Sequence, residues 1–183
     1  MHAPSGHMTA PVVQALLKDG ALAGEWALDP RASSIRLKSK VYGLVPVNGV
    51  FREVTGNGTV SPDGAASGTL TIAAASIDTK NTRRDTHLRS ADFFDSDSNP
   101  DITFTADAIR PSGQVVAVTG VLTVRGRTRR LSFDAVASVH GDSEIWLDAE
   151  VRINRYDFGL TWNWLGMVSA TSTLTVHAVF TRP

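Results

Sequence analysis

From Trp26 onward the sequence predicts an all-β domain, and two observations support this fold class. The first is strict alternation of apolar and polar residues, which is typical of strands with one dry face and one wet face. Ile145 and Leu147, for example, share a face opposite Trp146 and Asp148. The second is a series of turn sequences between these runs, namely GNG at 56–58, SPDG at 61–64, RPSG at 110–113, RGR at 125–127 and HGD at 140–142. About eight strands at hairpin spacing predict an antiparallel sandwich or barrel.

The alternating runs follow one another along the chain as SSIRLKSKV, GTLTIAA, DITFTADAI, RLSFDAVASVH, SEIWLDAEVRIN and TSTLTVHAVF. Each run has one apolar face, and in an antiparallel fold these faces must meet. Many positions on the apolar faces carry small side chains, which leave space and favour an internal cavity over a filled core, although tapered barrels also use small inward residues. These small residues are Ala106, Ala135, Ala137, Ala149 and Ala178.

Length and composition predict one globular domain. The chain has 183 residues, of which 42% are hydrophobic and 20% charged. Its formal net charge is zero, which argues against nucleic acid or a membrane surface as a partner attracted by bulk charge. The basic run RGRTRR at 125–130 lacks the aromatic residues of a nucleic-acid site and is interpreted as a solvated turn. The absence of cysteine excludes disulfides, thiolate zinc sites and a cysteine nucleophile.

No transmembrane segment is predicted, since no apolar run reaches the roughly 18 residues of a membrane span. The first residues lack the basic start and apolar centre of a secretory signal, so at face value the chain is expected to be cytoplasmic.

Residues 1–23 are expected to form an N-terminal arm, and residues 24–183 form the β domain. Within the arm, Pro11 to Gly20 predicts a short helix, because proline stands at its start and glycine at its end. The apolar face of this helix would consist of Val12, Val13, Leu16 and Leu17. Both an arm that packs on the domain and a lid or plug over a cavity are compatible with this pattern.

The segment Ser76–Asp95, SIDTKNTRRDTHLRSADFFD, concentrates charge and predicts one helix within the β region. Asn81 or Thr82 can cap its start, and Asp85 falls near its first turn. The chain therefore reads as strand, helix, paired phenylalanines and strand.

Catalysis by Asp85, His87 and Asp92 is one interpretation of this segment, since a histidine flanked by carboxylates can act as a general base. Asp85 and His87, however, are two residues apart and point to different sides of a helix. The preferred interpretation is structural: Arg84, Asp85 and His87 would tie the helix to the strands through ion pairs and hydrogen bonds.

A calcium loop after this helix is not supported. Asp95, Asp97 and Asn99 match its first, third and fifth positions, but Pro100 and Ala106 stand where glycine and glutamate are needed. No metal site is predicted.

Residues 76–104, SIDTKNTRRDTHLRSADFFDSDSNPDITF, resemble the signature of the YceI-like family. The shared features are a Ser-Ile-Asp-Thr-x-Asn start, then Arg-Asp-x-His-Leu, Asp-Phe-Phe-Asp and Pro-x-Ile-x-Phe. Further blocks agree, namely WALDPRASSI, VNGVFREVTGNGTV, GVLTVRGRTRRLSF and INRYDFG, so the resemblance covers about residues 24–183.

The resemblance implies an extended, eight-stranded antiparallel barrel that is lipocalin-like, with one short helix after the third or fourth strand. It also implies a cavity for a long apolar molecule such as a polyisoprenoid or an isoprenoid quinone, with no catalytic residues and no cofactor other than the bound lipid. The sequence departs from the family pattern at Ala32 and near Val41, where relatives carry histidine. A histidine contact to a polar head group is therefore not expected at these positions.

The stretch INRYDFGLTWNWLGMVSA, residues 153–170, is unusually apolar for a connection between two predicted strands. Loops rarely hold so much apolar area unless it is covered, so a plug that closes the barrel and the wall of an apolar pocket are both compatible with it. Arg155 is a candidate for contact with the head group of a ligand. The residues predicted to line the pocket are Leu37, Val41, Leu44, Phe94, Phe104, Phe133, Phe158, Trp162, Trp164 and Met167.

These observations predict a protein that binds, stores or transports a long apolar lipid without catalysis, with burial supplying about 0.8 kcal/mol per methylene group. The alternative is an enzyme that uses the apolar cavity to cyclise or isomerise a long-chain substrate by confinement. A third option is a structural module that binds a protein partner at the barrel rim, which a filled interior would favour. A homodimer is one option for the assembly, which the sequence leaves open.

Overall fold

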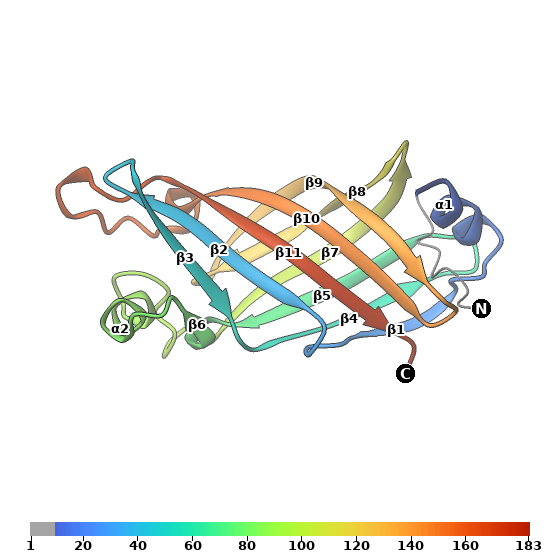
Figure 1. Ribbon diagram of the computed structural model, residues 1–183, viewed down its shortest axis with the longest axis horizontal. Helices are drawn as coiled ribbons and strands as arrows, with labels where there is room; N and C mark the ends of the chain where they lie inside the picture. Colours follow the sequence, from blue (N-terminus) through green and yellow to red (C-terminus); the bar gives the residue numbers. More distant parts are fainter. Residues whose placement is uncertain (1–9) are drawn as a thin grey trace, which may run out of the picture.

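The strands form one continuous antiparallel sheet that closes on itself in the computed structural model, which describes residues 10–183 (Figure 1). The side chains of Ala10 and Trp164 lie outside the described part. The strand segments are β1 (Gly24–Leu28), β2 (Ser34–Val41), β3 (Val45–Phe51), β4 (Val54–Val60), β5 (Ala66–Ala73), β6 (Ile77–Asp78), β7 (Asp101–Ser112), β8 (Val115–Val124), β9 (Arg127–His140), β10 (Glu144–Asn154) and β11 (Thr171–Thr181). The helices are α1 (Ala10–Lys18) and α2 (Thr82–Arg89), with short 3-10 turns at Ala74–Ser76, Arg155–Phe158 and Trp164–Gly166.

Three pairs of these segments, β1 with β2, β3 with β4 and β5 with β6, are bent strands with a short interruption between their halves. Counted in this way, the sheet is a closed eight-stranded antiparallel barrel, as the sequence predicts. The barrel closes along β11, which pairs with β2 at Leu174–Leu37 and with β1 at Phe180–Leu28. Helix α2 follows the third bent strand, which also confirms the predicted order.

The barrel is long because its strands are long. β9 has 14 residues, which at about 3.3 Å per residue span about 46 Å. The strands run obliquely along this length, with α1 at one end and α2 at the other (Figure 1). We call these the α1 end and the α2 end. The connection between β10 and β11, residues 155–170, and the turn between β2 and β3 both lie at the α2 end.

Helix α1 covers the α1 end. It spans Ala10–Lys18, close to the predicted Pro11–Gly20, and buries Val13 and Leu17 against the first strand at Trp26. The turn between β4 and β5 lies directly beneath the helix. Gly64 has a positive φ of 83° there, and a Cβ atom on it would lie 2.8 Å from the carbonyl oxygen of Leu17. The predicted arm therefore packs on the barrel as a cover for one opening.

The interior is apolar but not filled. One buried cluster surrounds Phe51 and Phe158 towards the α2 end, and a second surrounds Val13 and Trp26 towards the α1 end. Between the clusters, inward-facing side chains remain partly accessible, because they face space rather than other atoms. They include Leu70, Phe104, Leu131, Phe133, Leu147, Leu174, Val176 and Phe180.

Candidate ligand-binding site

Two apolar chambers lie end to end inside the barrel. The inner chamber, towards the α1 end, has a volume of about 190 Å³ and an almost wholly apolar wall. Val13 and Leu17 of α1 and Trp26 of β1 line it. The small residues that predict a cavity from the sequence also lie in its wall, namely Ala106, Ala135, Ala137, Ala149 and Ala178. Small side chains on four strands, β7, β9, β10 and β11, therefore leave this space open.

The outer chamber lies at the α2 end and is larger, at about 320 Å³. Its wall combines residues of β5, β7, β8, β10 and β11 with three further parts of the chain: β2 and β3, the α2 segment, and residues 155–170. Leu37, Phe94 and Trp162 are examples from each. Tyr42 and His87 also line it and are partly exposed, with 60% of Tyr42 accessible, so the chamber reaches the surface between the β2–β3 turn and α2.

The two chambers meet at a shared ring of side chains that we call the waist. Ile72, Leu122, Ile153 and Leu174 line both chambers. They come from β5, β8, β10 and β11, so the waist brings together strands that are far apart in the sequence. An apolar chain that passes the waist would occupy both volumes in one line.

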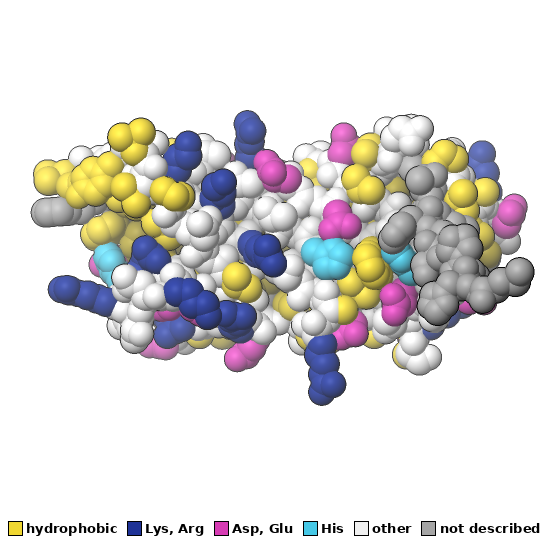
Figure 2. Space-filling view, in the orientation of Figure 1, with side chains coloured by type: hydrophobic (Ala, Val, Ile, Leu, Met, Phe, Trp, Pro, Cys, Tyr) yellow, Lys and Arg dark blue, Asp and Glu magenta, His cyan; other side chains and the backbone are white. Residues whose placement is uncertain are grey.

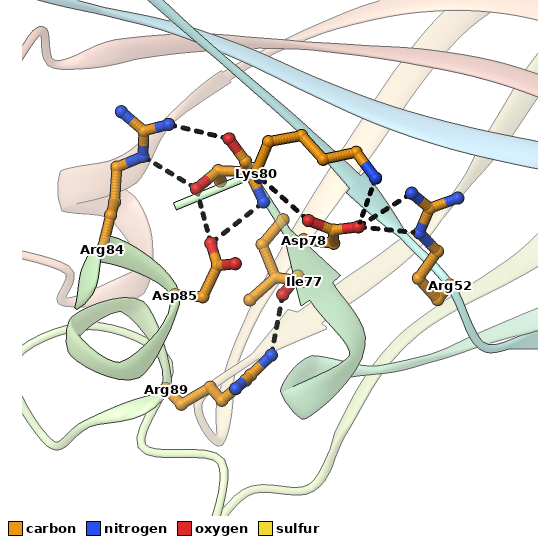
Figure 3. Close-up of polar contacts among 8 residues, drawn as sticks. Arg52, Ile77, Asp78, Lys80, Arg84, Asp85 and Arg89 are labelled. Atoms are coloured by element: carbon orange, nitrogen blue, oxygen red, sulfur yellow. Dashed lines mark hydrogen bonds and ion pairs between the residues drawn. The ribbon is translucent and has the colours of Figure 1, made fainter. Parts of the chain in front are cut away.

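Helix α2 is held over the outer chamber by a polar network that we call the clasp, formed by Thr79, Arg84, Asp85 and Arg89 (Figure 3). The Asn81 side chain caps the helix by accepting from the Arg84 backbone N–H at 3.0 Å. The buried Asp85 carboxylate accepts from the Thr79 backbone N–H at 2.9 Å and from its hydroxyl. Arg84 donates to Thr79, and Arg89 donates to the carbonyl oxygens of residues 75 and 77. Arg84 and Asp85 therefore have the structural role predicted for them, since their hydrogen bonds hold α2 to the segment that precedes it.

A second ionic group stands beside the clasp, on the outer side of β6. Asp78 lies 2.8 Å from Arg52 and 3.2 Å from Lys80 (Figure 3). The hydrogen bond from Arg52, followed by those from Lys80, holds the pKa of the Asp78 carboxyl well below its usual range. Because these groups are exposed, the pairing contributes little to stability.

The histidine of this segment contacts the opposite wall instead of the strands. His87 Nε2 lies 3.0 Å from Asp92, one of the two carboxylates that flank it in the sequence. Its ring packs edge-to-face on Trp162 at 4.5 Å and on Phe93 at 5.2 Å between ring centroids. These aromatic contacts join the α2 segment to residues 155–170 across the end of the outer chamber.

Arg155 fixes the shape of the connection between β10 and β11. Its guanidinium is buried and donates to the carbonyl oxygens of Leu160, Trp162, Val168 and Ser169 and to the hydroxyl of Tyr156. Burial lowers the pKa of the Arg155 guanidinium, which nevertheless stays charged in proteins. All its donors are already engaged, so a contact to a ligand head group would require breaking one of these bonds. This role of Arg155 cannot be predicted from the sequence, because it depends on the path of the β10–β11 connection.

The predicted pocket residues are divided between the chambers. Phe104 and Phe133 line the inner chamber. Leu44 lines neither chamber: it is 85% exposed, because the turn at Tyr42 and Gly43, both with positive φ, directs it outward. The Trp164 side chain lies outside the described part. The remaining predicted residues line the outer chamber, namely Leu37, Val41, Phe94, Phe158, Trp162 and Met167, together with Arg155.

Several wall residues were not predicted from the sequence. Tyr42 and His87 at the outer chamber, and Val13, Leu17 and Trp26 at the inner one, are the main examples. A signal existed for the helix, since Val13 and Leu17 belong to its predicted apolar face. Trp26 precedes the first alternating run, SSIRLKSKV, and its side chain is buried on the inner side of β1. Nothing in the sequence marked Tyr42, which follows the strand in a turn.

A closed antiparallel barrel with apolar chambers along its axis is the construction of proteins that enclose small apolar molecules. The YceI-like domain family matches residues 26–180, and the chain belongs to this family. Among residues 10–183 no helix is both long and apolar enough to cross a membrane.

Individual relatives agree with this assignment. The chain is 29% identical to Protein YceI of Escherichia coli O6:H1 over 150 residues, which cover 76% of this chain and 78% of that protein. The crystal structure of Burkholderia cenocepacia BcnA superposes with a TM-score of 0.77 at 26% identity and covers 83% of this chain and 98% of that one. A polyisoprenoid binding domain from Saccharophagus degradans, implicated in plant cell wall breakdown, has a TM-score of 0.72 at 18% identity, over 86% of this chain and 98% of that one, and shows the shared fold.

Proposed function

We propose that the protein binds one long apolar lipid of the polyisoprenoid class, such as a prenol or an isoprenoid quinone, and stores or transports it without changing it. The observation that carries this proposal is the pair of apolar chambers joined at the waist, with volumes of about 190 and 320 Å³. Ligand pockets in proteins commonly fall in the range of roughly 300 to 1,000 Å³. The chambers together suit a chain that is long and narrow better than a compact ring system.

The positions of polar side chains in the two chambers suggest which end of the lipid each chamber would hold. The inner chamber is lined by α1 at its end and has an almost wholly apolar wall, which suits the tail. Tyr42 and His87 are polar side chains at the open side of the outer chamber, which suits a small head group. Arg84 and Thr79 also line that chamber, but they are engaged with each other in the clasp. The proposed orientation therefore places the tail towards α1 and the head towards Tyr42.

Most of the binding free energy would come from apolar burial. Removing ten methylene groups from water contributes about 8 kcal/mol at about 0.8 kcal/mol each, before the cost of ordering the chain. The family and a structural neighbour described as a polyisoprenoid binding domain support the lipid class.

Native mass spectrometry of protein purified from its own host, followed by solvent extraction, tests the proposal. We expect a one-to-one complex with an extractable long-chain lipid. An empty protein that also fails to bind added prenols and quinones would refute it. Conversion of an added long-chain compound into a product that leaves the barrel would instead support the enzyme alternative.

A further inference from the structure

The open side of the outer chamber carries an exposed apolar surface that no part of the described chain covers. Tyr42, Leu44 and Val45 at the β2–β3 turn and Leu165 in the β10–β11 connection are 60%, 85%, 54% and 77% exposed. We call these side chains the apolar tips. In the space-filling view, apolar side chains gather at this end of the barrel with Lys and Arg beside them (Figure 2). Most other large apolar side chains of the described residues are buried or half-buried.

The two parts that carry the apolar tips are held together as one surface. The Tyr42 backbone N–H donates to the Met167 carbonyl oxygen at 2.7 Å, and the Ser169 N–H donates to that of Lys40 at 3.0 Å. Val41 and Val168 form a bridge between these two bonds. The tips therefore project from a backbone that is paired rather than from two independent loops.

The backbone at the tips is unusual for the residues it carries. Tyr42 and Leu165 have positive φ values of 56° and 53°, a conformation that glycine, asparagine and aspartate adopt more easily. The comparable positions elsewhere among the described residues carry polar side chains, namely Lys80, Asp95 and Arg125. Bulky apolar side chains at strained, exposed positions indicate a role outside folding.

Free positive charge lies next to the apolar tips. Arg36, Lys38 and Lys40 alternate along the outward face of β2, and Arg83 stands exposed at the start of α2. No carboxylate of the described residues lies within ion-pairing distance of these four side chains. The chain as a whole carries no net charge, so these cations are concentrated on the outward face of β2, which ends at the tips, and at the start of α2. Apolar side chains flanked by lysine and arginine are the pattern of surfaces that bind anionic bilayers.

We infer that the protein docks on anionic lipid membranes through the α2 end, with the apolar tips inserted among the lipid chains and the β2 cations against the phosphate groups. This inference rests on the proposed function for its purpose, because a lipid insoluble in water is held in a bilayer before a carrier takes it up. Docking in this orientation places the open side of the outer chamber against the membrane. The lipid can then pass between Tyr42 and His87 without crossing water.

Flotation with lipid vesicles tests the inference. We expect the wild type to bind vesicles of phosphatidylcholine with 30% phosphatidylglycerol at least about tenfold more tightly than vesicles of phosphatidylcholine alone, and less tightly as salt rises. Lys38→Gln and Lys40→Gln should each weaken binding by about fivefold, since each cation near such a surface contributes about 1 kcal/mol.

The apolar contribution is tested by the double variant Leu44→Ser with Leu165→Asn, in which asparagine also suits the positive φ. We expect a loss of about 100-fold, since each leucine removed from lipid costs about tenfold or more. Val136→Ser is the matched control, because Val136 is a 53% exposed apolar residue on the outer face of β9, away from the tips. It should bind vesicles like the wild type.

The same variants separate this inference from the proposed function. A prenol delivered from cyclodextrin should bind the double variant as it binds the wild type, because Leu44 and Leu165 line neither chamber. If the wild type binds vesicles but not the prenol, membrane docking is supported and the proposed ligand is rejected. A wild type that ignores both kinds of vesicle, or a double variant that binds them unchanged, would overturn docking. A dimer of the wild type that the double variant abolishes in sedimentation would assign the tips to an interface between copies and would also overturn it.

Discussion

Closing the waist should separate long ligands from short ones. Leu174 lies at the waist on β11 and is only partly buried, so its side chain faces the passage between the chambers. Leu174→Trp adds bulk at this point and should block a chain from entering the inner chamber. Thr175→Trp is the matched control, since Thr175 is the next residue on the same strand and faces outward. Where Leu174→Trp disturbs folding, Leu174→Phe is the milder variant.

The expected loss follows from the volume that becomes inaccessible. Filling an apolar space of this kind is worth about 24 cal/mol per Å³. The inner chamber, at about 190 Å³, therefore corresponds to about 4.6 kcal/mol by that same factor. Ordering the chain offsets part of this gain, so we expect the affinity for a long prenol to fall by a factor on the order of 100 to 1,000. A short prenol that fits the outer chamber should bind with unchanged affinity.

The chambers carry their own fluorescent reporters. Trp26 lines the inner chamber and Trp162 the outer one. A short prenol should shift the emission of Trp162 alone, whereas a long one should shift both in the wild type and only Trp162 in Leu174→Trp. Trp26→Phe and Trp162→Phe variants assign each signal. Equal losses for short and long prenols, or an unchanged ratio of their affinities in Leu174→Trp, would show that the chambers do not form one passage.

Three further predictions concern the parts that hold the site. Arg155→Lys should lower the free energy of unfolding, measured by denaturant titration, by about 2–4 kcal/mol. Lysine cannot replace the forked donors that bind the carbonyl oxygens of residues 160–169. The control Arg152→Lys, on the outer face of β10, should change the free energy of unfolding little. Asp78→Asn should slightly flatten the pH dependence of the melting temperature below about pH 4. A carboxyl whose pKa is lowered in the fold stabilises the fold above its ordinary pKa, and here this small contribution, screened by solvent, is lost as pH falls. The same pH dependence in both proteins would contradict this. Gly120→Ala should lower the free energy of unfolding by about 2–4 kcal/mol. The added Cβ would collide with the Thr105 carbonyl oxygen and lie 2.8 Å from the Ala106 Cα. Gly58→Ala is the control and should be tolerated, since the nearest atom to its Cβ would lie at 3.5 Å.

The sequence predicts much of the barrel, because strands with local alternation and turns with a glycine, such as Gly64, Gly126 and Gly141, carry local signals. The helix at Thr82–Arg89 is predicted for the same reason, since its cap at Asn81 is a local signal. The small inward residues also indicate the cavity correctly. Each of these features depends on a short stretch of sequence whose residues all favour the same local structure. The turn predicted at GNG, residues 56–58, is wrong, since these residues lie within β4.

The division into two chambers could not be predicted in this way. Ile72, Leu122, Ile153 and Leu174 are ordinary inward residues on their own strands, and they form a waist only because the register of β5, β8, β10 and β11 aligns them. Leu44 shows the opposite failure. It belongs to an apolar run without alternation, and its direction depends on the positive φ values in the turn that precedes it.

The role of Arg155 was missed for a third reason. A buried arginine can pair with a carboxylate, contact a ligand or bind backbone carbonyls, and the sequence does not distinguish these partners. Only the path of residues 160–169 places four carbonyl oxygens around the guanidinium.

Contacts to main-chain atoms leave the side chains around the outer chamber free to vary. Arg155 and Arg89 hold their segments mainly through carbonyl oxygens of the main chain, which every amino acid supplies. Side chains in the β10–β11 connection, such as Trp162 and Met167, can therefore be exchanged while the connection keeps its course. Selection or protein engineering could reshape the outer chamber for a different ligand by changing these side chains, with two arginines preserving the frame around them.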